Sequence, residues 1–354
     1  MSVLEQLTVN EKATCYGYGH DQGPVRTLVV STDASRRLLT NPVLVGAPYR
    51  ELLATAVSEA VAIAATADAR LGTAMTDSPA DVLVILRGGL TFALTEVLGT
   101  PEKPPAVSFI GTDRGTGGAT AVCYERWETA QGFLAFGDIV ATGGTVQVAL
   151  NAARRWYSGR DAPRHVLVVS IAAAPGVEVM RHALAELQRE GAGAATIIAL
   201  EAIFGLPSRP SPGIPQDHFD FLRTGYHPAP EFELARLAEP DSLFEKCAIY
   251  DGGLRAFSPD SHLRGRSDWW KRLIRNNDLS LYDLGGVVAG LGDFDQPYPA
   301  WLSRVPYHTD ASTFQQIYEL GKGAVEMARR NSVRQYGAKL VHSSDESTPN
   351  IMGT

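Results

Sequence analysis

The sequence predicts an α/β fold in which a parallel sheet is flanked by helices. Two observations carry this prediction. Apolar stretches of strand length alternate with stretches of helix length throughout the first 204 residues, which is the pattern of strand–helix–strand units. The strand-like stretches are also apolar at nearly every position, as in HVLVVSIAAAP at 165–175, and this is expected of strands buried on both faces.

The predicted elements follow one another in a regular order. An Ala-rich stretch with apolar residues at helical spacing, 51–71, precedes a short buried strand that stops at two glycines, 81–89. Two extended runs then flank a polar, Gly-rich loop within 106–127. They are followed by a strand at 133–140, a helix at 145–157, a strand at 165–175, a helix at 176–191 and a strand at 194–204.

The pattern changes after residue 205, where a Pro- and Ser-rich segment begins. Residues 205–280 show no clear period, and we expect them to form an insertion or cap on the core of residues 1–204. Residues 281–298 are expected to return to the core. The C-terminal extension, 299–354, is expected to contain a helix at 311–337 and to end in a disordered tail.

Composition and charge argue against several classes of protein. The chain of 354 residues has a net charge of -7 and no block of consecutive Lys or Arg, so a nucleic-acid partner is not expected. Its three cysteines include no Cys-x-x-Cys pair, which argues against a disulfide framework and a zinc site. No stretch approaches the ~20 apolar residues of a membrane span, so we expect no membrane partner and a cytoplasmic location.

The stretch FGDIVATGGTVQVAL, 136–150, contains the clearest functional signal. A strand carrying Asp138 near its end is followed by the bare turn Thr142-Gly143-Gly144-Thr145 and then by a helix. Free backbone N–H groups and the positive helix end meet at such a turn, which suits a phosphate. A plain strand-to-helix turn capped by Thr is the alternative.

A second strand also ends in a glycine turn, Arg87-Gly88-Gly89. Open α/β sheets bind ligands at the carboxyl ends of their strands, so the pair of turns favours the phosphate-site interpretation.

These segments resemble a known family. FLAFGDIVATGGT is similar to the phosphoribosyl pyrophosphate signature of type I phosphoribosyltransferases, and the uracil phosphoribosyltransferases fit best. Five further segments are similar to segments of that family and occur in the same order along the chain. They are PYRELLATAVSEAVAIAA, VILRGGLTFA, FIGTDRGTGGATAVCYERW, SIAAAPGVEVM and GGVVAGLGDFDQPYP. The resemblance covers roughly residues 45–205 and 281–298, and it implies a type I phosphoribosyltransferase-like fold with a flexible hairpin and a hood formed partly by the insertion.

The resemblance also implies roles for individual residues. Asp138 would bind ribose hydroxyls, Arg87 with Gly88 and Gly89 would bind pyrophosphate, and Arg114 would close over it from the hairpin. The 5-phosphate would be held by Ala141, Thr142, Gly143, Gly144 and Thr145, and the base by Val288, Gly290, Gly292 and Asp293. The alternatives are a surface ion pair for Arg87, a solvated loop arginine for Arg114 and a turn acid for Asp293.

The implied reaction is the transfer of ribose 5-phosphate from phosphoribosyl pyrophosphate to a small planar base, with release of pyrophosphate. Mg²⁺ would be carried mainly by substrate oxygens, with at most one carboxylate through water and no metal site made by the protein itself. The resemblance further implies a homodimer.

The sequence departs from the family at several positions. Gly137 stands where uracil enzymes keep an acid, and Ala289 stands where they have Pro. Phe294-Asp295-Gln296 also differs from the family's pattern, so we expect an acceptor other than uracil, such as another planar heterocycle or an aromatic. Two further alternatives are a sensor that binds a phosphoribosyl ligand without turnover, and an enzyme that hydrolyses the donor.

Overall fold

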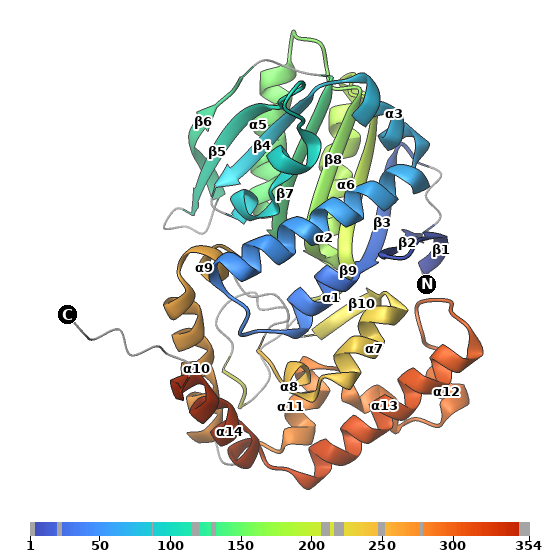
Figure 1. Ribbon diagram of the computed structural model, residues 1–354, viewed down its shortest axis with the longest axis vertical. Coiled ribbons are helices and arrows are strands. Elements are labelled where there is room, and N and C mark those ends of the chain that lie inside the picture. Colours follow the sequence, from blue (N-terminus) through green and yellow to red (C-terminus); the bar gives the residue numbers. More distant parts are fainter. Residues whose placement is uncertain are drawn as a thin grey trace, which may run out of the picture.

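A ten-stranded mixed sheet forms the centre of the protein (Figure 1). The computed structural model describes residues 4–19, 23–86, 88–114, 120–128, 132–206, 213–215, 223–246, 252–275 and 279–346. The strands are β1 (Leu4–Val9), β2 (Ala13–Tyr18), β3 (Val25–Thr32), β4 (Ala80–Leu86), β5 (Ala106–Arg114), β6 (Thr120–Arg126), β7 (Phe133–Val140), β8 (His165–Ala173), β9 (Ala194–Gly205) and β10 (Arg223–Pro228). The predicted α/β class is confirmed.

The strands lie in the order β1-β2-β3-β9-β8-β7-β4-β5-β6, and β10 pairs with β9. The six strands from β3 to β5 in this order are parallel, as the sequence predicts. The sheet is nevertheless mixed, because β1, β2 and β6 pair antiparallel at its two sides and β10 pairs antiparallel with the last residues of β9. All nine residues of β8 are buried, which explains why this strand is apolar throughout.

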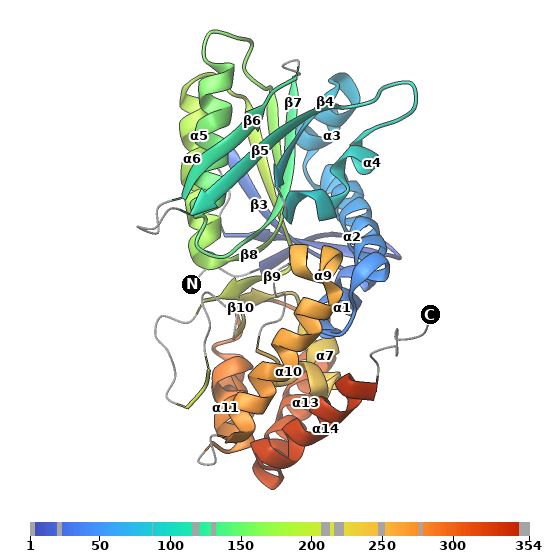
Figure 2. The same ribbon diagram turned by 90° about the vertical axis from the view of Figure 1, so that its left-hand side faces the viewer.

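Helices cover both faces of the sheet. The helices of the core are α1 (Asp33–Thr40), α2 (Gly46–Ala67), α3 (Ala69–Asp77), the 3₁₀ turn η1 (Gly88–Phe92), α4 (Leu94–Leu98), α5 (Gly144–Tyr157) and α6 (Ala174–Arg189). Figure 2 shows α5 and α6 on one face of the sheet and α2, α3 and α4 on the other. The expected helix at 51–71 is interrupted at Asp68, whose side chain accepts from the Arg70 amide and starts α3.

A helical cap lies beyond the carboxyl ends of the parallel strands, below the sheet in Figures 1 and 2. We use this name for the described residues between 230 and 346. Its elements are α7 (Pro230–Ala238), α8 (Pro240–Leu243), α9 (Gly252–Phe257), α10 (Pro259–Arg275), α11 (Leu281–Val288), η2 (Leu291–Asp295), α12 (Tyr298–Leu302), α13 (Ala311–Arg330) and α14 (Val333–Glu346). The helix expected at 311–337 is two helices, α13 and α14. Because α14 extends to Glu346, residues 343–346 of the expected disordered tail are helical, and residues 347–354 lie outside the described residues.

Candidate functional site

The order of the parallel strands identifies one position at which a ligand is expected. The chain passes from β4 outward to β5, and from β7 in the opposite direction through β8 to β9. The adjacent strands β4 and β7 therefore flank the point where the winding of the sheet reverses. Ligands of open α/β sheets bind outside the carboxyl ends of the strands at such a point.

The turn after β7 is held against α6. Gly143 has a φ of +86°, which favours glycine, and a Cβ on it would lie 2.7 Å from the Val179 Cβ. From the other side, a Cβ on Gly176 would lie 2.7 Å from the Ala141 carbonyl oxygen. Helix α5 then begins at Gly144 without a side-chain cap. Its first backbone N–H groups therefore donate no hydrogen bond to a capping side chain.

The open side of this turn is at its second glycine. A Cβ on Gly144 would have no described neighbour nearer than the Thr120 Oγ1, at 3.8 Å. Thr142 is exposed, and Ala141 and Thr145 are half-buried. The turn therefore presents backbone and hydroxyl groups to solvent at the end of a 14-residue helix, which is an arrangement suited to an anion.

The turn after β4 lies directly against the end of β7. A Cβ on Gly88 would lie 2.5 Å from Asp138 Oδ1, and a Cβ on Gly89 would lie 3.0 Å from the Gly137 carbonyl oxygen. Gly88 therefore leaves room for the Asp138 carboxylate, and Gly89 lies close against the backbone of β7. Ala93, which follows η1, has a φ of +50°, and non-glycine residues in this region concentrate at functional sites.

Asp138 lies between the two glycine turns. It is 9% exposed, its Oδ1 accepts from the Ile139 amide at 2.9 Å, and its carbonyl accepts from the Ser170 hydroxyl at 2.8 Å. These contacts hold the residue at the carboxyl end of β7. The structure thus brings Asp138, Gly88, Gly89 and residues 141–145 to one edge of the sheet.

Phe92 is a residue of this site that the sequence analysis missed. A Cβ on Gly137 would lie 2.5 Å from Phe92 Cγ, and Phe92 is fully buried. The phenylalanine ring therefore occupies the space that any side chain at position 137 would need. The glycine at position 137, where the uracil enzymes keep an acid, therefore makes room for the Phe92 ring.

The side chains of both arginines expected to be catalytic lie outside the described part of the chain. Arg87 lies outside the described residues, and Arg114 is described only as the last backbone position of β5. The hairpin of β5 and β6 nevertheless approaches the site, because Thr120 at the start of β6 is the nearest described neighbour of a Cβ on Gly144.

The four expected base-binding residues lie in the cap. Val288 ends α11 and is buried, Gly290 has a φ of +67°, and Gly292 and Asp293 are exposed. The intervening Ala289 carbonyl accepts from Arg236 Nη1 at 3.1 Å. In Figures 1 and 2 α11 lies below β10, whereas the glycine turns lie on the sheet above it. The structure therefore groups these residues with the cap helices and not with Asp138.

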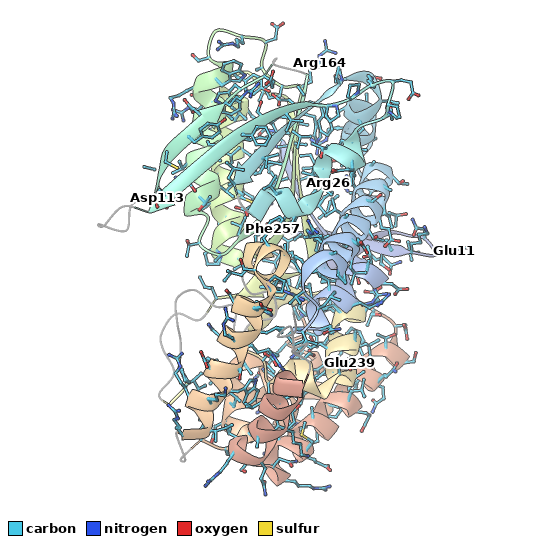
Figure 3. All side chains as sticks on the ribbon, turned by 60° about the vertical axis from the view of Figure 1, so that its left-hand side comes forward. Glu11, Arg26, Asp113, Arg164, Glu239 and Phe257 are labelled. Carbon is cyan, nitrogen blue, oxygen red and sulfur yellow. The ribbon has the colours of Figure 1, made fainter. Side chains whose placement is uncertain are left out.

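A different part of the cap reaches the site. Helix α9 packs against both η1 and α2, and a Cβ on Gly252 would lie 2.7 Å from Ile139 Cδ1 and 2.9 Å from the Tyr49 hydroxyl. Figure 3 labels Phe257 at the last turn of α9, beside η1. Residues 205–280 show no clear period, so the contact of α9 with β7 was not predictable from the sequence.

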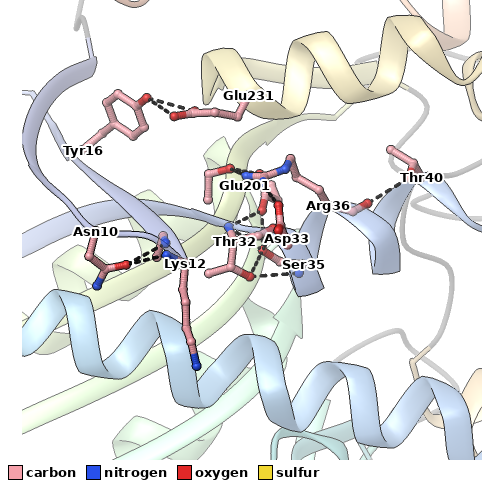
Figure 4. A network of polar contacts seen from close by, with 12 residues as sticks. Asn10, Lys12, Tyr16, Thr32, Asp33, Ser35, Arg36, Thr40, Glu201 and Glu231 are labelled. Atoms are coloured by element: carbon pink, nitrogen blue, oxygen red, sulfur yellow. Dashed lines mark hydrogen bonds and ion pairs between the residues drawn. The ribbon is translucent and has the colours of Figure 1, made fainter.

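A buried carboxylate also joins the sheet to its surroundings, away from the glycine turns. Glu201 in β9 is fully buried with a φ of +65°, and burial raises its pKa to about 7. It accepts from the Ser31 hydroxyl at 2.6 Å, the Thr32 amide at 2.8 Å and the Ser35 hydroxyl (Figure 4). Its carbonyl accepts from the Ala229 amide at 2.7 Å, so Glu201 connects α1 and the start of the cap to the sheet.

No protein-family model matches the chain, and no curated protein matches it in sequence. Within the described ranges no cluster of three His, Cys, Asp or Glu side chains is placed to hold a metal ion. In that part of the chain no single helix is long and apolar enough to cross a membrane. Helices α2 and α3 together have the length and composition of a membrane span, but a bend of 113° separates them.

Proposed function

We propose that the protein is a phosphoribosyltransferase of the type I class, which transfers ribose 5-phosphate from phosphoribosyl pyrophosphate to a planar acceptor. One observation carries the proposal. Two glycine turns and the carboxylate of Asp138 meet where the winding of the sheet reverses, and this is where a phosphorylated ligand is expected. A phosphoribosyltransferase fold, a cytoplasmic location and a homodimer are parts of the same proposal.

The described residues suit the parts of this donor. The amides at the start of α5, with Thr142 and Thr145, would bind the 5-phosphate. The Gly88 and Gly89 backbone would face the pyrophosphate, and Asp138 would accept from ribose hydroxyls. Arg87 and Arg114 retain the roles that the sequence resemblance implies for them.

Mg²⁺ fits this donor set only as a partner of the substrate. Asp138 is a single carboxylate whose Oδ1 already accepts from an amide, and Mg²⁺ commonly keeps several waters while binding one or two carboxylates and substrate phosphates. When bound, the ion would neutralise charge on the departing pyrophosphate.

In the proposed reaction a nucleophilic atom of the acceptor forms a bond to the anomeric carbon. The bond from that carbon to pyrophosphate breaks, and its electron pair leaves with pyrophosphate. The protein supplies no covalent nucleophile, so its contribution is to hold the donor and acceptor in line. Fixed amides and Asp138 would also stabilise the positive charge that develops on the ribosyl group.

The test is a pyrophosphate-release assay with phosphoribosyl pyrophosphate and Mg²⁺, run with uracil, other heterocycles and aromatic acids, and without an acceptor. Release that depends on one acceptor supports the proposal and identifies that acceptor. Release without any acceptor would instead indicate hydrolysis. Absence of donor binding would contradict the proposal.

Asp138→Asn gives a residue-level test. Asparagine keeps an Oδ1 that can accept from the Ile139 amide, so we expect little change in thermal stability. Turnover should fall at least tenfold because the charge facing the ribose is lost. Asp161→Asn, at an exposed position between α5 and β8, serves as the control. Near-normal turnover of the Asp138 variant would contradict its assignment.

A sensor that binds the donor without turnover is the second candidate. The observation that favours it is Phe92, whose ring fills the space beside Gly137 where uracil enzymes have an acid. Donor binding without pyrophosphate release, across the whole acceptor panel, would support this function in place of transfer.

A further inference from the structure

We infer that α9 and η1 bind the ring of the acceptor, and that the acceptor is a planar aromatic carboxylate. The inference rests on the proposed function and names the acceptor for that same site. The surface proposed to bind the ring consists of Leu90 in η1 with Leu254 and Phe257 in α9, and we call it the apolar rim.

The position of α9 places the apolar rim beside the candidate donor site. Gly252, the first residue of α9, abuts Ile139 at the end of β7. The helix rises about 1.5 Å per residue, so its six residues span roughly 8 Å from that contact. Leu90 follows Gly88 and Gly89 directly, and α9 packs against η1. The rim therefore borders the turn assigned to pyrophosphate. Figure 3 labels Phe257, the rim residue at the end of α9.

The side chains of the rim are unusually exposed for their type. Leu90 is 48% exposed, Leu254 is 38% exposed and Phe257 is 46% exposed. Leu254 and Phe257 are three residues apart, so they lie on the same face of α9, while Gly252, Arg255 and Ala256 form the buried face. Among the described residues only seven large apolar side chains are exposed, and three of them lie on these two short elements. We assign the acceptor ring to this concentration of exposed apolar side chains because it lies beside the candidate donor site.

The charge beside the rim indicates the class of ring. The Arg50 guanidinium lies over the Phe257 ring, 5.7 Å from its centroid. Arg50 is exposed near the start of α2. The guanidinium is a planar fork of N–H groups that matches the two oxygens of a carboxylate. A planar ring resting on the apolar rim would thus have its carboxylate directed to Arg50.

Uracil and orotate form a matched pair of probes, since orotate is uracil with an added carboxylate. Ligand-observed NMR titrations would give the affinity of each for the protein in the presence of pyrophosphate and Mg²⁺. We expect tighter binding of orotate than of uracil. We also expect Leu254→Ser and Phe257→Ser to weaken orotate at least tenfold, and Arg50→Met to reduce its affinity to that of uracil.

The control is Tyr124→Ser, which removes an aromatic side chain of similar exposure, 48%, from β6. Thermal melts would check that every variant folds. Equal affinities for the two probes, an equal effect of the Tyr124 change, or unchanged orotate binding in the rim variants would each overturn the inference. Sedimentation velocity adds one more outcome: rim variants that only dissociate a dimer would show that a second copy covers the rim.

A separate titration with phosphoribosyl pyrophosphate distinguishes this inference from the proposed function. The rim variants should bind the donor within twofold of the unaltered protein. If the protein binds the donor and the rim variants bind acceptors normally, the inference is overturned and the proposed function stands. Rim-dependent orotate binding by a protein that does not bind the donor would contradict the proposed function and support the ring site.

Discussion

At the scale of single residues, the clearest case is the packing of Phe92 against Gly137. A Cβ on Gly137 would approach Phe92 atoms to 2.5–2.7 Å, and Phe92 cannot move easily because it is fully buried. We expect Gly137→Ala to lower the free energy of unfolding by about 1–3 kcal/mol, as overpacked cores do. Urea denaturation would measure the change.

The same pair allows a double-mutant test. Phe92→Ala alone should cost about 3–5 kcal/mol through the cavity it leaves. In that background the methyl group of Gly137→Ala has room, so its added cost should nearly vanish. Gly286→Ala, at a helical glycine with no neighbour within 4 Å of a Cβ, should be neutral or slightly stabilising. Additive losses in the double variant would contradict the steric explanation.

Glu201 is predicted to make stability depend on pH. Its pKa rises from the ordinary value of 4.5 to about 7 because the side chain is buried. The folded state therefore holds a proton that the unfolded state has released, and stability falls as the pH rises from about 4.5 through about 7. At about 1.4 kcal/mol per pKa unit, this carboxyl would account for a loss of roughly 3 kcal/mol.

Glu201→Gln removes this titration while keeping the shape of the side chain. Asp81, whose pKa burial raises to about 6, and His165, whose pKa burial lowers to about 4, remain in both proteins. The difference in unfolding free energy between the two proteins therefore isolates Glu201. Urea denaturation at pH 5 and pH 8 should show a smaller loss in the glutamine variant. Parallel pH profiles would show that Glu201 does not titrate in this range.

At the scale of elements, the two glycines of the turn before α5 are predicted to behave differently. Gly143→Ala should destabilise the protein by about 2 kcal/mol, since it combines a φ of +86° with a Cβ 2.7 Å from Val179. Gly144→Val has space around its Cβ, so the protein should fold normally and lose binding of phosphoribosyl pyrophosphate. Thermal melts and calorimetric titration separate the two effects, and normal donor binding by Gly144→Val would place the phosphate elsewhere.

The strands and helices of the core were predictable because their local patterns agree with their final environment. The strand expected at 133–140 is β7, residue for residue, since an apolar run between turn residues has few alternatives. The break between α2 and α3 was not predicted, because it depends on Asp68. This side chain starts α3 and also accepts from the buried Thr196 hydroxyl at 2.8 Å, a contact that no local pattern encodes.

At the scale of the whole molecule, strand order and the cap depend on contacts between distant parts of the chain. The sequence predicts which turns carry glycines, but the adjacency of β4 and β7 follows from the sheet as a whole. Likewise, Trp269 is buried in α10 and donates its Nε1 to the Pro215 carbonyl at 2.7 Å. Such contacts leave no local signal in the sequence, and the contact of the cap with the end of β7 through Gly252 became evident only in the fold.

Arg255 is predicted to hold the cap against the core. It is fully buried in α9, its guanidinium lies 4.5 Å from the Tyr49 ring centroid, and it donates to the carbonyls of Asn41 at 2.8 Å and Leu44 at 2.9 Å. These carbonyls belong to the connection between α1 and α2. Arg255→Met would keep much of the side-chain volume and leave these part-buried carbonyls without their donor, at a cost of up to about 1–3 kcal/mol for each group.

Hydrogen exchange would show where that loss acts. Because Arg255 joins one cap helix to one connection of the core, we expect faster exchange in α9 and in residues 41–45, with β7 and β8 amides unchanged. Arg264→Met, at an exposed position of α10, should leave all of these amides unchanged. If exchange instead rises equally in β7 and β8, the cap and the sheet unfold as one unit. Local unfolding of α9 would also displace the rim residues that it carries. We therefore expect the Arg255 variant to bind the acceptor more weakly and the donor normally.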